Sequence, residues 1–409
     1  MKAMGAIPGG FEANAEGVLT VGGQDARRLV EQAKGTPLFV YDNNLIGAKI
    51  ALFRAALPDG LGLHYAVKAN PYPPLLKWIC KFVDGFDIAS EGELAALENV
   101  GAAVIPLSFA GPGKSDRELE RAIKAKATIS IESEGEAARL LDVASRLGIR
   151  PKVMVRVNPP FQLKGAGMKM GGAASPFGID HDHAAEVVRG LIEAGADWRG
   201  LHIYPGSQCL DGAAIVEAQG ASVTLAGQIA DAAGAEPPEI NLGGGFGIPY
   251  FAGEAPLDIY SLGRAMGDML AECPVSLGAS RFTLELGRWL VGEAGVYLTR
   301  VTDRKVSRGE TFLVTDGGLH HMLAASGNFG QLLRRNYPVA VATRFGAPAE
   351  EATNVVGNLC TPLDIIADQV ELPHAEPGDL IALFCAGAYG LSASPQAFLS
   401  QTGAREMMV

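Results

Sequence analysis

The 409-residue sequence is low in charge and has no excess of basic residues. Charged residues make up 19% of the chain, and the formal net charge is −11. Binding to a phosphodiester backbone needs a basic face, and no lysine or arginine cluster here is interleaved with aromatic residues. We therefore expect no nucleic acid among its partners.

Uninterrupted apolar runs are also missing, although hydrophobic residues make up 48% of the chain. No stretch approaches the ~20 apolar residues that span a bilayer. Residues 1–11 lack the continuous apolar segment of a signal peptide. These absences predict a soluble, globular protein of the cytoplasm that has no membrane partner.

Cysteine is scarce and unpaired in the sequence. The five cysteines are scattered, and none belongs to a Cys-x-x-Cys pair. Disulfide frameworks and zinc sites usually show cysteines at short, paired spacings. We expect most of these cysteines to be buried thiols and one of them to be chemically active, and we expect no metal site.

The length exceeds what one hydrophobic core usually supports, which predicts two domains. From about residue 37 to residue 288, strand-like runs alternate with helix-like segments, a pattern typical of parallel strands with helical crossovers. About eight such units favour a (β/α)₈ TIM barrel, and a doubly wound open sheet is the alternative. The expected strands are residues 37–41, 63–67, 86–88, 104–109, 127–131, 152–157, 200–204, 240–242 and 282–284. The expected crossover helices include residues 91–100, 115–124, 134–147 and 213–233.

After residue 288 the pattern changes to β-branched and apolar runs that are separated by turns. This change predicts a second, mainly β domain over residues 289–409. Residues 18–21 form one more such run, so an N-terminal segment, residues 1–36, is expected to join the β domain. The barrel would then occupy residues 37–288. The expected strands of the β domain are residues 293–303, 310–315, 339–343, 353–356 and 379–384.

Lys68 is the residue that points most directly to chemistry. It follows an apolar, strand-like run and precedes Ala-Asn-Pro, which predicts a lysine at the end of a buried strand. A charge in that position is costly unless it is paired or lost, and an uncharged lysine can attack a carbonyl group to form an imine. The alternative is a strand-end lysine that only reaches solvent.

Three successive glycines, Gly243, Gly244 and Gly245, follow another apolar strand-like run. Their N–H groups can close on an anion because no Cβ stands in the way. Phosphate sites of barrels lie after late strands, which favours this interpretation. Glycine triplets also occur in ordinary turns, so the pattern alone is weak.

Further polar residues follow late strands of the expected barrel. Glu285 and Arg288 lie where the catalytic residues of barrels gather, although such a pair can also be a weak surface ion pair. Alternation along the strand places His202 and Tyr204 on one face. A core or turn position is the alternative for these two.

Taken together, these segments resemble the fold-type III, pyridoxal-phosphate-dependent decarboxylases of the diaminopimelate, ornithine and arginine decarboxylase family. The resemblance runs over nearly the whole chain and implies an alanine-racemase-like barrel plus a β domain. The matching segments, in family order, are residues 64–70, 85–94, 175–179, 206–208, 243–245, 285–288, 360–364 and 387–389.

The resemblance assigns roles to individual residues. It implies that Lys68 holds pyridoxal 5'-phosphate as an imine and that Tyr204 stacks on the cofactor, where the family usually carries histidine. Glu285 would face the pyridine nitrogen and keep the ring protonated, which favours decarboxylation over racemisation. Cys360, supplied by the partner subunit of a homodimer with a shared active site, would deliver the proton to the product. The other implied cofactor-binding residues are Asp87, Ser207, Gly243, Gly244, Gly245, Arg288 and Tyr389.

The sequence departs from the family where the substrate would bind. The Cys-Glu-Ser-Gly-Asp motif has become Cys-Thr-Pro-Leu-Asp, which keeps Asp364 near the expected distal end of the substrate. The arginine and tyrosine of the diaminopimelate branch are replaced by a stretch with His320 and His321, which could touch the substrate or form a polar pair at a domain junction. These changes resemble decarboxylases of biosynthetic clusters, including those acting on glutamyl-carrier proteins or associated with exosortase systems.

Three hypotheses follow. The leading one is a pyridoxal-phosphate-dependent decarboxylase of an amino acid or of an aminoacyl group on a carrier protein. The second is a diaminopimelate decarboxylase that makes L-lysine. The third, of another class, is a catalytically silent binding or regulatory protein on the same scaffold; retention of Lys68, the glycine triplet and Cys360 argues against it.

Overall fold

The computed structural model describes residues 1–331 and 333–409, and the chain divides into two compact units. We call them the barrel unit and the β unit. The barrel unit contains Ile50–Gly247 and Pro256–Gly287. The β unit contains Met1–Lys49, Ile248–Ala255 and Arg288–Val409.

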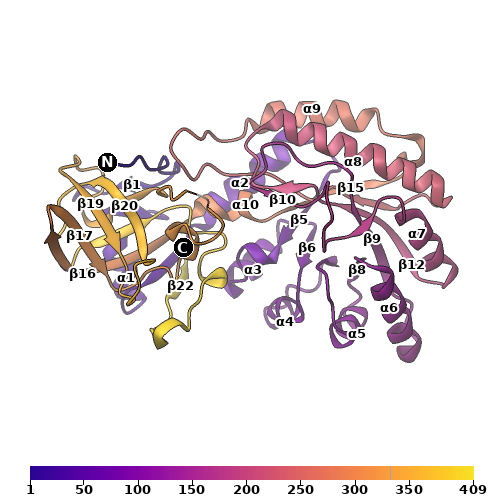
Figure 1. The fold of residues 1–409 in the computed structure, drawn as a ribbon, viewed down its shortest axis with the longest axis horizontal. Coiled ribbons are helices and arrows are strands. Elements are labelled where there is room, and N and C mark those ends of the chain that lie inside the picture. The colour runs from indigo at the N-terminus through magenta and orange to yellow at the C-terminus, as the bar shows by residue number, and fades with distance from the viewer. Residues whose placement is uncertain (332) are drawn as a thin grey trace. The chain divides into compact units, whose positions relative to one another are not determined.

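Eight parallel strands form the core of the barrel unit (Figure 1). Each strand pairs in parallel with the next, and the last pairs with the first, so the sheet closes on itself. The strands are β5 (Gly62–Ala66), β6 (Gly85–Ile88), β7 (Leu107–Phe109), β8 (Thr128–Ile131), β9 (Lys152–Asn158), β12 (Asp197–Ile203), β14 (Glu239–Asn241) and β15 (Arg281–Leu286). The predicted (β/α)₈ barrel is therefore confirmed.

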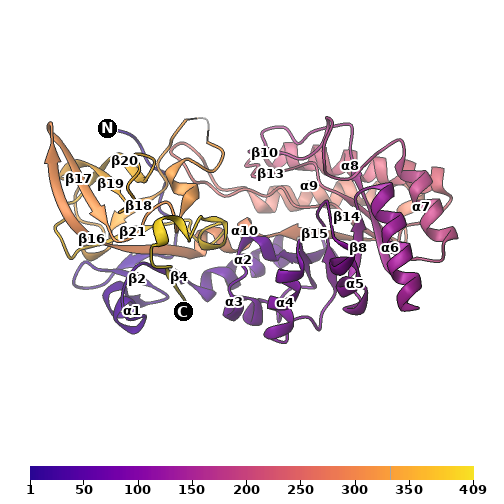
Figure 2. The ribbon, with the colours of Figure 1, turned by 60° about the horizontal axis from the view of Figure 1, so that its bottom comes forward.

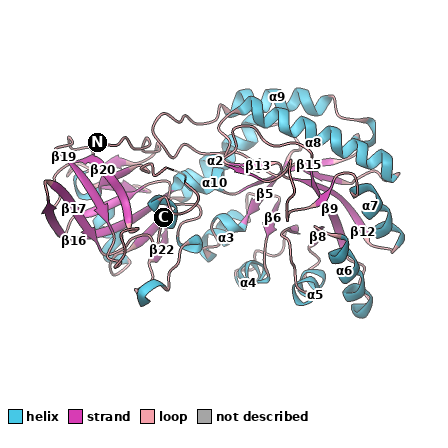
Figure 3. Cartoon of the chain, viewed as in Figure 1, coloured by secondary structure: helices cyan, strands magenta, loops and turns pink. Residues whose placement is uncertain are grey.

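Helices lie outside these strands, as Figure 3 shows by the cyan helices above and below the magenta strands of the barrel unit. The helices are α3 (Pro73–Ile79), α4 (Glu91–Asn99), α5 (Asp116–Lys124), α6 (Glu134–Leu147), α7 (Ala184–Glu193), α8 (Gly212–Ala233) and α9 (Ile259–Ala271); α2 (Asn43–Ala56) crosses from the β unit into the barrel unit. Among the helices of the described residues, none combines the length and the apolar character needed to cross a membrane.

Serine caps fix the starts of three consecutive crossover helices. Ser90, Ser115 and Ser133 each accept a hydrogen bond from the backbone N–H three residues later. Such a cap contributes about 1 kcal/mol to helix stability. Because each cap sets where a helix begins, it also sets the length of the loop between that helix and the preceding strand. These loops carry the polar residues at the carboxyl end of the barrel.

The β unit is built on an eight-stranded sheet. Its strands are β4 (Leu38–Tyr41), β16 (Gly295–Ser307), β17 (Glu310–Thr315), β18 (Val339–Val341), β19 (Glu351–Val356), β20 (Ile365–Leu372), β21 (Leu380–Leu383) and β22 (Arg405–Met408). Most pairs are antiparallel; β17 with β19 and β22 with β4 are parallel. The predicted second unit of mainly β structure is confirmed.

One predicted barrel strand was wrong. The run at residues 37–41 forms β4, which pairs antiparallel with β16 and parallel with β22 in the β unit. All four residues of β4 are buried, so its apolar run looks like that of a barrel strand. Apolar periodicity shows that a strand is buried but not which sheet it joins. The prediction that the barrel begins at residue 37 is therefore wrong, because this first strand belongs to the β unit.

A small N-terminal sheet completes the β unit. It consists of β1 (Glu12–Ala13), β2 (Leu19–Val21) and β3 (Gln24–Asp25), and Figure 2 shows α1 (Ala26–Gln32) beside it. Strand β2 is not hydrogen-bonded to the large sheet, but Leu19 and Val21 lie in one core cluster with Val296 and Leu298 of β16. Burial of each such side chain contributes roughly 1.5–3 kcal/mol. The N-terminal segment thus joins the β unit through packing.

Candidate functional site

Lys68 lies directly beyond the carboxyl end of β5, in the short helix η1 (Val67–Ala69). Its Nζ is 3.5 Å from Oδ2 of Asp87 and 5.9 Å from the centre of the Tyr204 ring. The lysine side chain is 38% exposed, whereas Asp87 is 1% exposed. The structure therefore brings together three of the residues that the sequence assigned to a cofactor, with the amine accessible.

Asp87 is the third residue of β6 and is fully buried. Ser108 Oγ donates a hydrogen bond of 3.0 Å to Asp87 Oδ1. Burial, together with the negative charge of Glu285, raises the pKa of Asp87 to about 6, and Lys68 acts in the opposite direction. An acid with a pKa near neutrality can exchange a proton with a neighbouring amine.

Glu285 lies on β15, next to β5 in the barrel, and is buried. The side-chain amide of Asn241 donates a hydrogen bond of 2.9 Å to Glu285 Oε1. His202 Nε2 is 3.2 Å from the same oxygen, and its Nδ1 is 3.4 Å from Ser130 Oγ. Burial lowers the pKa of His202 to about 3, and Arg156 acts in the same direction. The glutamate is therefore fixed by an amide and faces a neutral imidazole.

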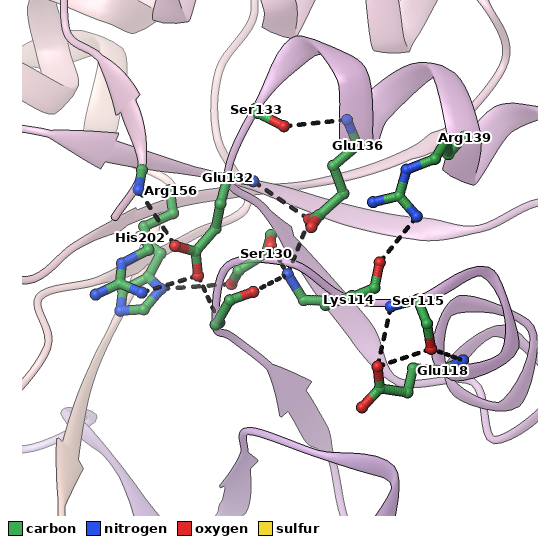
Figure 4. A network of polar contacts seen from close by, with 12 residues as sticks. Lys114, Ser115, Glu118, Ser130, Glu132, Ser133, Glu136, Arg139, Arg156 and His202 are labelled. Carbon is green, nitrogen blue, oxygen red and sulfur yellow. Dashed lines mark hydrogen bonds and ion pairs between the residues drawn. The ribbon is translucent and has the colours of Figure 1, made fainter. Parts of the chain in front are cut away.

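A network of buried charges lies beside His202 (Figure 4). Arg156 donates a hydrogen bond of 2.8 Å to Glu132, which also accepts the backbone N–H groups of Gly111 and Gly178. Both charged side chains are almost fully buried. Removing one partner of such a pair is costly because the other charge is left buried and alone. The network fixes the carboxyl ends of β8 and β9 around His202.

Lys114 extends this network on the side of α6 (Figure 4). Its Nζ donates to Glu136 Oε1 at 2.8 Å, to the carbonyl oxygen of Gly111 at 2.8 Å and to that of Ser130 at 2.7 Å. An ammonium group has three donor hydrogens, and all three have acceptors here. Lys114 is thus satisfied by the protein itself.

The glycine triplet forms a loop after β14 that packs tightly against the same group of residues. Gly243 and Gly245 have φ angles of 65° and 95°, which favour glycine. A Cβ on Gly243 would lie 2.2 Å from the Tyr204 ring, and a Cβ on Gly244 would lie 2.2 Å from the carbonyl oxygen of Glu285. These positions have no room for a side chain.

Ser207 lies in the short strand β13 (Gly206–Ser207), which pairs with β10 (Met168–Lys169). A Cβ on Gly245 would lie 3.3 Å from the carbonyl oxygen of Gly206, and Cys209 donates its backbone N–H to the carbonyl of Gly245. The turn that carries Ser207 therefore lies next to the glycine loop, as the phosphate assignment requires.

In the β unit, Arg288 opens the short helix α10 (Arg288–Val291). Its Nη1 donates a hydrogen bond of 3.0 Å to the hydroxyl of Tyr250, and its guanidinium lies 4.7 Å from the centre of the Tyr389 ring. The buried Nε of Arg288 has no hydrogen-bond partner within the described part of the chain. An unsatisfied donor in a buried cation points to an anionic ligand.

Cys360 and Asp364 lie in the loop between β19 and β20 but differ in environment. The Cys360 side chain is exposed. Asp364 is buried and accepts the backbone N–H of Leu319 at 2.6 Å and that of Leu359 at 2.9 Å. Burial raises the pKa of Asp364. Asp364 therefore ties two loops of the β unit together.

His320 and His321 are both buried, with ring centres 3.8 Å apart, but only one is satisfied. His321 Nδ1 lies 3.1 Å from the Tyr297 hydroxyl and its Nε2 lies 2.9 Å from the carbonyl oxygen of Thr402. Burial lowers the pKa of His321 to about 4. For His320, neither ring nitrogen has a partner among residues 1–331 and 333–409. Of the two histidines, His320 is therefore the one whose ring nitrogens have no partner among these residues.

Sequence reasoning missed several contributors to this site. His202 was named only as a residue on the same strand face as Tyr204, and Asn241, a polar residue at a strand end, was given no role, although that position in a barrel was the available signal. Glu132 follows an apolar run, and Arg156 lies within one. These positions predict that each charge is buried beside an opposite charge, but they do not show which residue is the partner. Tyr250 carried no sequence signal, because its role depends on the loop Ile248–Ala255 joining the β unit.

Comparison with known proteins covers most of the chain. Residues 43–292 match the family model described as "Pyridoxal-dependent decarboxylase, pyridoxal binding domain". The chain is 36% identical over 372 residues to the L-glutamyl-[BtrI acyl-carrier protein] decarboxylase of Niallia circulans, covering 89% of this chain and 86% of the relative. It is 33% identical over 399 residues to the diaminopimelate decarboxylase of Methanothermobacter thermautotrophicus, covering 94% and 89%.

Solved structures show the same similarity in three dimensions. Diaminopimelate decarboxylase from Helicobacter pylori, complexed with L-lysine, has a TM-score of 0.82 at 26% identity and covers 94% of each chain. The diaminopimelate decarboxylase from M. jannaschi has a TM-score of 0.87 at 25% identity and covers 97% of this chain and 92% of the neighbour. The similarity extends over both compact units.

Proposed function

Because this chain belongs to the pyridoxal-dependent decarboxylases, we propose that it removes CO₂ from an aminoacyl group whose distal end is attached to a carrier protein. The expected resemblance to this family is confirmed, and with it the class of reaction and the cofactor, pyridoxal 5'-phosphate. The identity of the substrate and the role of each residue form the proposal.

The residues in the structure fit this cofactor. Lys68 presents an accessible amine for the aldehyde, and Glu285 is a fixed carboxylate suited to the pyridine nitrogen. The buried, unsatisfied Nε of Arg288 fits an anion such as a phosphate group. We propose that the phosphate is held by the glycine loop, Ser207, Arg288 and Tyr389.

When bound, the cofactor supplies an electron sink for the electron pair that remains after loss of CO₂. Asp87, with its raised pKa, accepts and returns the proton of the Lys68 amine. Glu285, positioned by Asn241, would hold a proton at the pyridine nitrogen. Tyr204 would shield the cofactor ring from water. Cys360 Sγ donates the proton that replaces the lost carboxyl group.

The substrate proposal is carried by one observation, the lack of a charged residue in the stretch that replaces the arginine and tyrosine of the diaminopimelate branch; Arg334, which follows this stretch, donates its Nε to the carbonyl oxygen of Ser326. Residues 317–331 contain no Lys, Arg, Asp or Glu. The carboxylate of Asp364 is taken by two backbone N–H groups, and both nitrogens of His321 have partners. A small ionic substrate would have no counter-charge from this stretch. A neutral, carrier-linked end fits it, and we propose that His320 donates a hydrogen bond to that end.

A panel of substrates tests the proposal. Cofactor-loaded protein is incubated with glutamyl-carrier protein, free glutamate, meso-diaminopimelate, lysine, ornithine and arginine, and CO₂ release is measured for each. We expect release from the carrier-linked substrate and little from the free amino acids. Efficient release from a free amino acid, with none from the carrier-linked form, would contradict the proposal.

Diaminopimelate decarboxylase is the second candidate. It is supported by the 33% identity to a diaminopimelate decarboxylase over 94% of this chain and by the structural similarity across both units. It predicts that meso-diaminopimelate alone in the panel releases CO₂, with L-lysine as the product. The absence of a charged residue in 317–331 argues against it.

We further propose that the protein is a cytoplasmic homodimer in which Cys360 acts in the site of the partner protomer, and that the two compact units are its two domains. The exposure of Cys360 in its own protomer supports this arrangement. Sedimentation of the cofactor-loaded protein tests it. Mixing of an inactive Lys68→Ala chain with an inactive Cys360→Ala chain should restore part of the activity if the site is shared.

A further inference from the structure

A cavity of about 410 Å³ lies at the amino end of the barrel strands. Lys152, Glu239 and Arg281 of its lining are the first residues of β9, β14 and β15. Lys68 and Glu285 lie at the carboxyl ends of β5 and β15. The cavity is therefore separate from the cofactor site.

The charged residues of this lining are mostly basic. They are Lys126, Lys152, Arg199, Arg281 and Glu239. Four positive charges thus face one carboxylate, and burial raises the pKa of that carboxylate. A concave site with one sign of charge concentrates ligands of the opposite sign.

The basic residues are not neutralised by strong ion pairs. Arg281 lies 3.9 Å from Asp84 and Arg199 lies 3.8 Å from Asp197, and such long, exposed contacts contribute little. Asp84 already accepts hydrogen bonds from Arg54 and from the backbone of Leu63. Lys126 and Lys152 have no ion pair in the described part of the chain.

His64 provides a second, independent observation. It lines the cavity from β5 and is 4% exposed, and its Nδ1 has no hydrogen-bond partner among the described residues. The opposite edge of the ring packs closely on the backbone, since a Cβ on Gly85 would lie 2.7 Å from Nε2. Buried polar groups are normally satisfied, so a residue of the cavity lining that keeps an unpaired nitrogen is an exception that a bound ligand would explain.

We propose that this cavity binds a small anion with at least two negative charges, such as a phosphate ester or a polycarboxylate. Lys126, Lys152, Arg199 and Arg281 provide the charge, and His64 provides a hydrogen bond from the wall. A volume of about 410 Å³ is within the range of small-molecule sites. The site is additional to the cofactor phosphate and to the substrate.

Calorimetric titration of the cofactor-loaded protein tests the proposal. The bound cofactor occupies the other phosphate site, so that added anions do not report on it. Pyrophosphate and citrate are titrated separately, with sodium chloride of equal ionic strength as the control. We expect saturable binding of at least one: pyrophosphate alone indicates phosphate esters, and citrate alone indicates polycarboxylates. No saturable binding of either at millimolar concentration overturns the proposal.

Charge-removing variants locate the site. The Lys152→Gln/Arg199→Gln protein should bind the probe at least about tenfold more weakly, since two charge-assisted contacts are lost. The Lys305→Gln/Arg308→Gln protein, which loses two exposed charges from the β unit, serves as the matched control and should bind as the parent does. If both double variants weaken binding of the probe equally, or if neither does, the anion binds elsewhere and the proposal for this cavity is rejected.

Discussion

Two lysines at the carboxyl end of the same barrel lie in opposite environments. Lys68 follows β5 and is 38% exposed, with Asp87 at 3.5 Å. Lys114 follows β7 and is 2% exposed, with three acceptors at 2.7 to 2.8 Å. An ammonium group that is enclosed and fully hydrogen-bonded by the protein has no access to a substrate. The comparison shows that chemistry at this barrel end depends on what the protein leaves accessible.

Replacement of Lys68 is expected to have the largest effect. Lys68→Ala should lose covalently bound cofactor and lower the rate of CO₂ release by at least about 10³-fold, the range for loss of a group that moves protons in the reaction. Absorbance of the denatured protein after borohydride reduction reports the covalent cofactor. If the Lys68→Ala protein still carries the reduced cofactor, another lysine forms the covalent bond and the assignment of Lys68 is wrong.

Replacement of Lys114 should affect stability instead. Lys114→Met leaves Glu136 buried without its partner, which costs about 3–5 kcal/mol of unfolding free energy. The double variant Lys114→Met/Glu136→Leu should recover most of this loss, and both proteins should retain covalent cofactor. Urea unfolding measures the stability. Loss of cofactor from a folded Lys114→Met protein would show that the two lysines are not functionally distinct.

Asp87, the acid beside Lys68, predicts a pH dependence of stability. Its pKa rises from 3.8 in the unfolded chain to about 6 in the folded protein, so the folded state binds more protons between these values. Stability should therefore fall by up to about 3 kcal/mol as the pH rises from 4 to 6. Asp87→Asn should remove this slope. Asp182 is exposed, so the Asp182→Asn protein is the control. If the slope of stability against pH is unchanged in Asp87→Asn, the slope comes from other groups.

The histidine pair offers the same comparison in the β unit, with a smaller expected effect. His321→Phe removes the hydrogen bonds of the His321 ring with the Tyr297 hydroxyl and the Thr402 carbonyl and should cost about 1–3 kcal/mol of stability. His320→Phe removes no hydrogen bond within the described residues, so it should cost less stability than His321→Phe, and it should raise KM for the carrier-linked substrate with little change in kcat. If KM rises only in His321→Phe, then His321 and not His320 contacts the substrate, contrary to the proposal.

Much of the fold could be predicted because local patterns carry it. Alternating apolar runs and helical segments gave the barrel strands to within a few residues, and residues 134–147 and 310–315 match a helix and a strand of the structure. The run at 37–41 was placed in the wrong sheet, because a buried apolar strand has the same pattern in either one. Its partners are distant in sequence, at β16 and β22.

The candidate site was predictable to the extent that it follows from strand ends. Lys68, Glu285 and the glycine triplet lie next to β5, β15 and β14, as the sequence indicated. The distinct environments of Asp364 and His320 were not predictable, since each depends on whether neighbouring loops supply hydrogen-bond partners. Those loops come from distant parts of the chain, as the hydrogen bond between Leu319 and Asp364 shows.

The sequence by itself determined the barrel, the second β unit, the position of a lysine at a strand end and the absence of charge in residues 317–331. These features depend on local periodicity and on residue identity. The tertiary structure decided which lysine is accessible, which histidine is unsatisfied and which cations face a common cavity at the amino end of the barrel. Burial and hydrogen bonding depend on contacts between residues far apart in the chain, and only folding brings those residues together.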